Sequence, residues 1–234
     1  MIMGEKIKAL KAAFPHTIPV LTGYLFLGFA FGILLSSKGY SAGWAIVMST
    51  VIYAGAMQFV AIGLLTTVFQ PLSALLITLV VNARHLFYGI SMLRQFSGTG
   101  RKKPYLIFGL TDETFSILCS AEPPQDVDRG WFMFFISLLN QAYWVIGSAL
   151  GGILGSMVAF NTKGIDFVMT ALFVVIFIEQ WKSQKYHAPA IIGIAASALC
   201  LLLFGAGNFI IPAMIMIVVL LTLLRTRLER RAAE

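Results

Sequence analysis

Charged residues are scarce in this chain. Asp, Glu, Lys and Arg together make up 12% of its 234 residues, whereas 59% are hydrophobic and the mean hydropathy is +0.87. A soluble domain of this size needs more polar surface than that to cover itself. The longest polar stretches run for about ten residues, which leaves no room for a separate soluble domain. We therefore expect an all-α, polytopic membrane protein whose residues 1–234 form a single transmembrane domain.

The motifs of enzyme chemistry are missing as well. The sequence contains no Cys/His metal-ligand spacing, no Gly-x-Ser-x-Gly and no phosphate-cradling glycine loop. Its two cysteines, Cys119 and Cys200, lie in apolar segments, where cysteine packs as a small hydrophobe. We therefore expect no enzyme activity, no metal and no cofactor. The net charge of +7 does not indicate nucleic-acid binding, because the basic residues lie in short connections and tails.

The sequence contains several long apolar runs. Residues 16–36, 42–68 and 131–160 carry no charge and are about 21, 27 and 30 residues long. About 20 helical residues cross a ~30 Å hydrocarbon core, so each run is long enough to span a membrane. With the shorter runs we expect seven to eight transmembrane segments, at residues 16–36, 42–68, 71–93, 105–121, 131–160, 165–181, 188–204 and 208–224. The segment at 105–121 is the least hydrophobic and is expected to be short, broken or re-entrant.

Basic residues predict the orientation, because cytoplasmic loops of membrane proteins are enriched in Lys and Arg. With eight crossings, one side of the membrane carries about ten basic residues, in the two tails and at Arg129, Lys182 and Lys185. The other side carries about six, including the basic loop at residues 94–103. This count places both termini in the cytoplasm. If the segment at 105–121 is re-entrant, the two termini fall on opposite sides.

The sequence also suggests an internal duplication, with halves at residues 14–121 and 131–226. Residues 30–59 can be aligned with residues 150–181. The matched pairs are Gly32 with Gly152, Met48 with Met169, and Gln58 with Glu179 or Gln180. Secondary transporters are often built from duplicated halves that bind substrate between them. Four crossings per half would make the repeats parallel, and three would make them inverted. The alternative to a duplication is chance similarity between two glycine-rich helices.

Ionisable residues inside two apolar segments indicate a candidate site, since each such group costs about 2.5–3.5 kcal/mol at the centre of a membrane helix. Along a helix, Arg84 lies about 20 Å from Pro71 and about 14 Å from Leu93, which is too deep for its charge to reach the interface easily. Asp112 and Glu113 lie midway along the following segment. We expect Arg84 to pair with one of these acids. A purely structural ion pair is the alternative to a functional site.

A single ion pair leaves other polar residues unexplained. At 100° per residue, Asn82 and Arg84 point about 200° apart. Either this helix is buried on several faces, or its backbone is interrupted near residues 82–85, as in helices where transporters expose backbone groups to substrate. The expected substrate-binding residues are Asn82, Arg84, His85, Asp112, Glu113 and Gln58. Interhelical hydrogen bonding is the alternative for Gln58, and also for Asn140 and Gln141.

Two groups of glycines lie at four-residue spacing. They are Gly28 with Gly32, and the ladder of Gly147, Gly151 and Gly155. Small residues at this spacing let membrane helices approach closely. We expect them to mark helix–helix contacts.

Four stretches of this sequence, in their order and spacing, resemble the AzlC-type family of branched-chain amino-acid permeases. They are Gly28-Phe29-Ala30-Phe31-Gly32 preceded by Pro19 and Gly23, Met48-Ser49 with Tyr53-Ala54-Gly55-Ala56-Met57-Gln58-Phe59, Val81-Asn82-Ala83-Arg84-His85, and Leu110-Thr111-Asp112-Glu113. The resemblance covers nearly the whole chain. It implies export of valine, leucine and isoleucine, with methionine as a further candidate, across a bacterial inner membrane. It also implies a partner, a small AzlD-type membrane subunit of about one hundred residues.

The residues themselves suggest a mechanism. A zwitterionic amino acid needs a cationic or N–H-rich site for its carboxylate, which Arg84, Asn82 or an interrupted helix N-terminus could supply. Asp112 or Glu113 would bind its ammonium group. Export against a gradient needs an energy source, and the candidates for carrying a coupled proton are Glu113, Asp112, His85 and Glu179, the last of which could instead be interfacial. The alternatives are a transporter of another small solute and a non-transport structural subunit.

Overall fold

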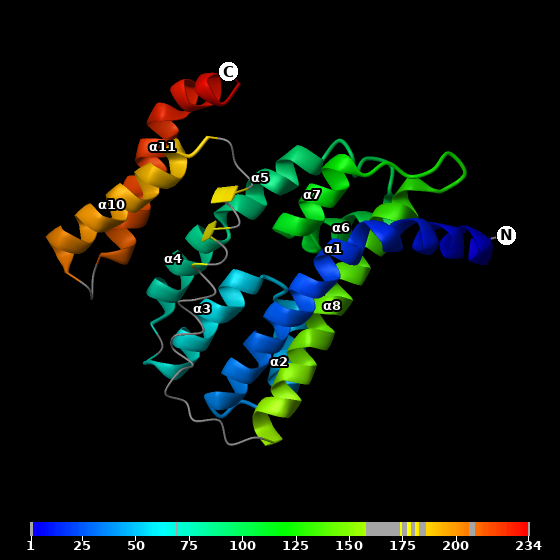
Figure 1. Cartoon of the computed structure of the whole chain (residues 1–234), viewed down its shortest axis with the longest axis horizontal. Helices are drawn as coiled ribbons and strands as arrows, with labels where there is room; N and C mark the ends of the chain where they lie inside the picture. Colours follow the sequence, from blue (N-terminus) through cyan, green and yellow to red (C-terminus); the bar gives the residue numbers. More distant parts are fainter. Residues whose placement is uncertain are drawn as a thin grey trace. The chain divides into compact units, whose positions relative to one another are not determined.

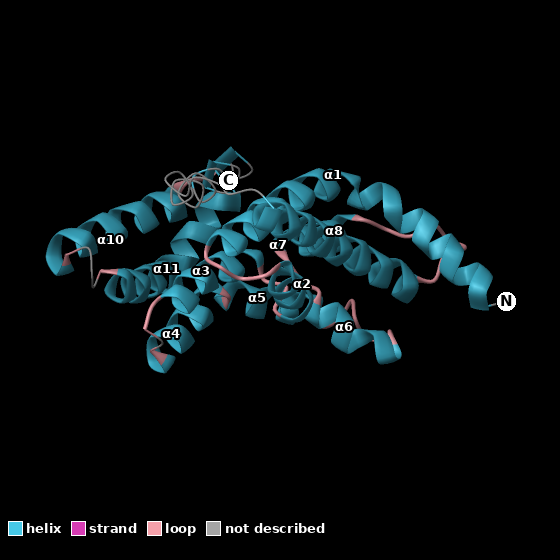
Figure 2. Ribbon diagram, turned by 90° about the horizontal axis from the view of Figure 1, so that it is seen from below, coloured by secondary structure: helices cyan, strands magenta, loops and turns pink. Residues whose placement is uncertain are grey.

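The structure is a computed structural model that describes residues 2–68, 70–157, 174, 177–178, 181–182, 186–205 and 209–233. Every regular element within these ranges is a helix (Figures 1 and 2), which confirms the all-α expectation. The chain divides into two compact units, Met1–Ile165 and Asp166–Glu234. Two of the described helices are long and apolar enough to cross a membrane, and one bent helix pair is a third if it counts as a single span.

The first unit is built on two long helices that lie side by side, α1 (Ile2–Ser37) and α8 (Arg129–Met157) (Figure 1). His16 packs against Phe132 and a Cβ on Gly155 would touch Ser36, so the two helices run in the same direction. We refer to the N-terminal end and the C-terminal end of this α1–α8 pair. The remaining elements of the unit can be placed relative to these two ends.

Glycines let the backbones of α1 and α8 touch. A Cβ on Gly28 would lie 2.8 Å from the Trp144 carbonyl oxygen, and a Cβ on Gly147 would lie 2.7 Å from the Leu25 carbonyl oxygen. Real Cβ atoms do not approach backbone atoms so closely, so only glycine fits at these positions. The expectation that the two glycine groups mark a close helix contact is confirmed.

Residues 42–66 fold back on themselves, so the single segment expected at 42–68 is wrong. They form α2 (Ala42–Val51) and α3 (Gly55–Thr66), separated by a break at which Tyr53 has a φ of 44°. The Tyr40 hydroxyl, just beyond α1, donates to the Leu65 carbonyl at 3.2 Å. Both outer ends of this first hairpin therefore lie at the C-terminal end of the α1–α8 pair.

The next segment runs to the opposite end of the unit, but it is bent. Helices α4 (Pro71–Val81) and α5 (Ala83–Met92) meet at Asn82 with an angle of 43° between them. Just beyond α5, the Gln95 side chain accepts a hydrogen bond from Arg129 at 3.4 Å. The segment thus ends at the N-terminal end of the α1–α8 pair. Of the two alternatives for this polar helix, the structure shows the interrupted backbone near residues 82–85.

A second hairpin enters from that N-terminal end. It follows the short helix η1 (Gly100–Lys102) and consists of α6 (Lys103–Phe108) and α7 (Asp112–Ser120), with a break at residues 109–111. At the start of the hairpin, Lys102 Nζ lies 3.5 Å from Asp128 Oδ1. Beyond the end of the hairpin, Asp126 Oδ2 forms an ion pair with Lys8 Nζ at 3.0 Å. Both ends of the hairpin therefore lie beside the start of α1 and α8. The broken segment expected near 105–121 is confirmed.

This arrangement corrects the expected position of the basic loop at residues 94–103. The Nζ atoms of Lys6 and Lys102 each lie 4.5 Å from the centre of the Trp131 ring, so the loop lies beside the N-terminal tail. The expectation that it lies on the opposite side from the tail is wrong, because that count assumed that the segment at 105–121 crosses. The basic residues of the tail, the loop and the start of α8 lie at one end of the α1–α8 pair.

The second unit contains α10 (Ala188–Phe204) and α11 (Ile210–Ala233), which pack against each other. They correspond to the segments expected at 188–204 and 208–224. Most of the segment expected at 165–181, with Glu179 and Gln180, lies outside the described residues. The duplication into halves 14–121 and 131–226 and the total of seven to eight segments therefore stay predictions.

Candidate functional site

The break in the second hairpin places two acids at the start of α7, level with the middle of α1 and α8. Asp112 and Glu113 occupy the first turn of this helix. The Thr111 side chain caps it, accepting a hydrogen bond from the Thr114 backbone N–H at 3.2 Å. Carboxylates are stabilised at a helix N-terminus by the partial positive charge of its unpaired N–H groups. The interrupted backbone thus accounts for two adjacent acids inside an apolar segment.

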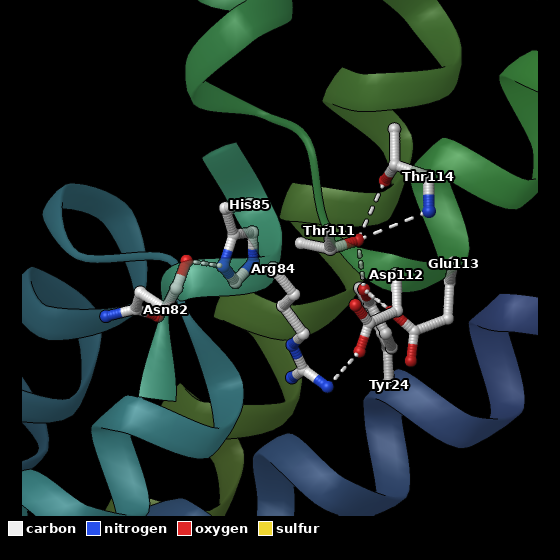
Figure 3. Close-up of polar contacts among 8 residues, drawn as sticks. All are labelled: Tyr24, Asn82, Arg84, His85, Thr111, Asp112, Glu113 and Thr114. Carbon is white, nitrogen blue, oxygen red and sulfur yellow. Dashed lines mark hydrogen bonds and ion pairs between the residues drawn. The ribbon is translucent and has the colours of Figure 1, made fainter. Parts of the chain in front are cut away.

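Asp112 forms an ion pair with Arg84, at the start of α5. The distance between Arg84 Nη1 and Asp112 Oδ2 is 2.8 Å, and the side chains are 35% and 33% exposed (Figure 3). The expected pairing of Arg84 with one of the two acids is confirmed, with Asp112 as the partner. Within the described residues, Arg84 Nε and Asp112 Oδ1 are buried atoms without a hydrogen-bond partner. The pair therefore retains one unused donor and one unused acceptor.

Glu113 belongs to a separate hydrogen-bonded group that links α1, α7 and α8. The Tyr24 hydroxyl donates to Glu113 Oε2 at 2.6 Å and lies 2.6 Å from Thr111 Oγ1 (Figure 3). The hydroxyls of Thr111 and Thr114 are hydrogen-bonded at 3.0 Å, and Asn140 donates to Thr114 Oγ1 at 3.0 Å. A continuous chain of hydroxyl groups therefore leads from α8 to the Glu113 carboxylate.

The polar residues beside Arg84 in the chain make contacts of their own. In Figure 3 the Asn82 amide points away from the Arg84 guanidinium. His85 Nδ1 lies 3.3 Å from the Asn82 carbonyl oxygen, and its ring packs edge-on against Tyr88 with 5.9 Å between ring centres. Of the polar residues expected on this segment, the structure therefore pairs Arg84 with Asp112. Asn82 and His85 are adjacent to Arg84 in the sequence but form no ion pair or hydrogen bond with Asp112 that the structure shows.

Gln58 lies in a third polar group, inside the contact between the first hairpin and α8. Trp144 Nε1 donates to Gln58 Oε1 at 2.8 Å, and Gln58 Nε2 donates to Ser49 Oγ at 3.1 Å. Ser49 in turn donates to Ser148 at 2.8 Å. Gln58 is fully buried, and its amide has a partner for both its oxygen and its nitrogen. Interhelical hydrogen bonding accounts for its position.

The tips of the two hairpins meet beside the middle of α8. Gln141 accepts a hydrogen bond from the Tyr105 hydroxyl of α6 at 2.6 Å and donates to the Thr50 carbonyl of α2 at 3.0 Å. The rings of Tyr53 and Phe108 lie 6.2 Å apart across the two breaks. Hairpins that enter from opposite ends of the α1–α8 pair are thus joined at mid-length through one glutamine.

Two tyrosines of this region were not among the expected site residues. Tyr24 contacts Glu113, and Tyr53 lies at the break of the first hairpin with its ring buried. A hydroxyl-bearing aromatic in the middle of a charge-free run was the available signal for both. Among the described residues, no group of three or more His, Cys, Asp or Glu side chains could hold a metal ion.

Comparison with known proteins agrees with these observations. The model of the family described as "AzlC protein" matches residues 19–158. The chain is 58% identical to "Branched-chain amino acid transport protein AzlC" of Bacillus subtilis (strain 168) over 222 residues, 95% of this chain and 87% of that protein. It is 46% identical to a membrane protein of Helicobacter pylori (strain J99) over 97% of this chain and all of that protein. It is 27% identical to "Inner membrane protein YgaZ" of Escherichia coli (strain K12) over 72% of each chain.

No solved structure matches this chain. The family match covers more than half of the sequence and includes both hairpins, Arg84 and the two acids. Its relatives carry the names of membrane and transport proteins. This chain belongs to the AzlC family.

Proposed function

We propose that this protein is a secondary transporter that exports branched-chain amino acids across the bacterial inner membrane. One observation carries the proposal: the Arg84–Asp112 ion pair lies at two helix interruptions inside an apolar molecule and retains an unused donor and an unused acceptor. Interrupted helices and charges at mid-depth are the means by which transporters bind polar substrates. The name of the Bacillus relative supports the substrate class, namely valine, leucine and isoleucine, with methionine as a further candidate.

The ion pair suits both ends of a zwitterion. The Arg84 guanidinium can donate to the substrate carboxylate, and Asp112 Oδ1 can accept from the substrate ammonium group. Both are charge-assisted hydrogen bonds, which are stronger than neutral ones. Because the zwitterion carries one charge of each sign, it can insert beside the pair without leaving a net buried charge. One methylene in an apolar wall discriminates only about 10–200-fold, so we expect overlapping affinity for the branched substrates.

Glu113 is the proposed carrier of a coupled proton. Asp112 is held by Arg84, whereas Glu113 is bonded to a neutral hydroxyl that can either donate or accept. Each hydroxyl has one proton. When Glu113 is ionised, Tyr24 donates to it and accepts from Thr111; when Glu113 is protonated, the direction of these hydrogen bonds can reverse. Asp112, His85 and Glu179 are the other candidates for this role, and Asn82 and Gln58 remain candidates for substrate contact.

The basic residues support an orientation with the N-terminus in the cytoplasm. The N-terminal tail, the loop at residues 94–103 and Arg129 lie at one end of the α1–α8 pair. Cytoplasmic faces of membrane proteins are enriched in such residues, so we propose that this end faces the cytoplasm. A small AzlD-type membrane subunit is the proposed partner, on the basis of the family resemblance.

The test is valine counterflow in proteoliposomes that contain this protein, with and without the AzlD-type subunit. We expect saturable valine exchange that leucine and isoleucine inhibit. Dependence on the small subunit would establish it as part of the transporter. Exchange of a different amino acid alone would replace the substrate assignment, and absence of any exchange by folded protein would refute a transport function.

A further inference from the structure

Tyr53 has a buried hydroxyl without a hydrogen-bond partner. The residue is 4% exposed, and its oxygen makes no well-formed hydrogen bond within the described part of the chain, although the hydroxyls of Tyr24 and Thr114 lie near it. Buried tyrosine hydroxyls normally have a partner, because burial removes their hydrogen bonds to water. This hydroxyl therefore loses its hydration on burial without gaining a well-formed hydrogen bond in return, which disfavours the folded state.

The backbone of Tyr53 is also unfavourable. Its φ is 44°, and among the described residues other than glycine it alone has a positive φ. This left-handed region brings the Cβ of an L-residue close to a carbonyl oxygen, and glycine is the residue that adopts it freely. Strained residues of this kind cluster at ligand-binding and switch regions. A tyrosine here is therefore costly in both its backbone and its side chain.

The position of Tyr53 connects it to the acids of α7. It lies at the tip of the first hairpin, with its ring 6.2 Å from that of Phe108, three residues before the cap of α7. Phe108 and Glu113 belong to the same hairpin and lie on either side of its break. Gln141 fixes the two tips beside each other through Thr50 and Tyr105, so the break at Tyr53 is held beside the second hairpin.

We propose that the Tyr53 hydroxyl hydrogen-bonds the polar end of the transported amino acid. The first hairpin then contributes to the substrate site whose charged residues come from α5 and α7. The bound amino acid supplies the partner that the hydroxyl lacks in the empty protein. This inference rests on the proposed transport function and adds a specific ligand contact to it.

The test uses Tyr53→Phe, which keeps the ring and removes the oxygen. Binding of radiolabelled valine and thermal unfolding are measured on the same purified protein. We expect valine affinity to fall about tenfold or more, as for a lost hydrogen bond to a charged group. The melting temperature should stay the same or rise, because the variant no longer buries an unpaired hydroxyl. A hydroxyl with a purely structural role would lower the melting temperature on removal.

Tyr143→Phe is the matched control. The Tyr143 hydroxyl is hydrogen-bonded to Thr17 at 3.0 Å in the contact between α1 and α8, so its removal should lower the melting temperature and leave valine affinity unchanged. If wild-type protein binds valine and Tyr53→Phe binds it equally well, this inference is wrong while the proposed function stands. A loss of binding together with a lower melting temperature would also overturn it. If folded wild-type protein binds no branched-chain amino acid, the proposed function fails and this contact fails with it.

Discussion

Replacing Arg84 by alanine tests whether the ion pair is a substrate site or a structural link. The Nη1–Oδ2 distance to Asp112 is 2.8 Å. Two unit charges 4 Å apart attract each other by about 4 kcal/mol at an effective dielectric constant near 20. Both side chains are about one-third exposed, so we expect less than this to be lost on substitution, about 1–3 kcal/mol of the free energy of unfolding. The variant should therefore still fold.

Transport should suffer far more than stability. If Arg84 binds the substrate carboxylate, its removal deletes a charge-assisted contact and leaves the carboxylate unpaired, which costs about 2–5 kcal/mol in binding. This corresponds to a loss of roughly 30- to 4,000-fold in valine affinity, at about 1.4 kcal/mol per factor of ten. Arg101→Ala, at an exposed position in η1, should leave both valine counterflow and the melting temperature unchanged.

The exchanged pair Arg84→Asp with Asp112→Arg separates the two roles. A structural link depends only on the attraction between the two residues, so the exchange should restore both stability and transport. A substrate site depends on which end of the pair faces the carboxylate, so the exchange should restore the melting temperature without restoring valine counterflow. Full counterflow in Arg84→Ala, or in the exchanged variant, would refute the assignment of Arg84 to substrate binding.

Gly147→Ala should lower the melting temperature, because its Cβ would meet the backbone of α1 at 2.7 Å and overpacking costs about 1–3 kcal/mol. Gly23→Ala, whose Cβ meets nothing within 4 Å, is the control, and equal melting temperatures would contradict the close contact. Tyr24→Phe should keep valine exchange but reduce accumulation driven by a pH gradient about tenfold, since a hydrogen bond to a charged group contributes about 1.5–3 kcal/mol; undiminished accumulation would exclude this hydroxyl from proton coupling. In a variant without native cysteines, an impermeant maleimide should label Ser97→Cys from the cytoplasmic side and Ser41→Cys from the opposite side. Labelling of both from one side would favour the eight-crossing arrangement.

The sequence predicts the ion pair and the bend at Asn82 for physical reasons. A charge about 14–20 Å from both ends of a helix needs a partner, and the acids of the following segment were the available ones. The angular separation of Asn82 and Arg84 led to the interrupted helix as one of two explanations. The structure supports that explanation, and it also shows that the interruption leaves the Asn82 amide directed away from the pair.

The first hairpin could not be predicted in the same way. Its break at residues 52–54 carries an isoleucine, a tyrosine and an alanine, none of which ends a helix by its own propensity. Hydropathy does not distinguish one apolar helix of 25 residues from two short ones that turn back. The wrong placement of the loop at residues 94–103 has the same origin, because counting basic loops assumes that every apolar segment crosses. The contact between Tyr24 and Glu113 joins residues 89 apart, which no local pattern reveals.

The direct backbone contact between α1 and α8 limits where an alternating-access cycle can take place. With no side chain between Gly28 or Gly147 and the facing carbonyl groups, neither helix can rotate or slide past the other without a collision of main-chain atoms. The tips of the hairpins are joined to α8 by side-chain hydrogen bonds such as those of Gln141, which can break and form again. We therefore expect α1 and α8 to stay fixed as one scaffold while the hairpin tips open in turn toward the two sides of the membrane.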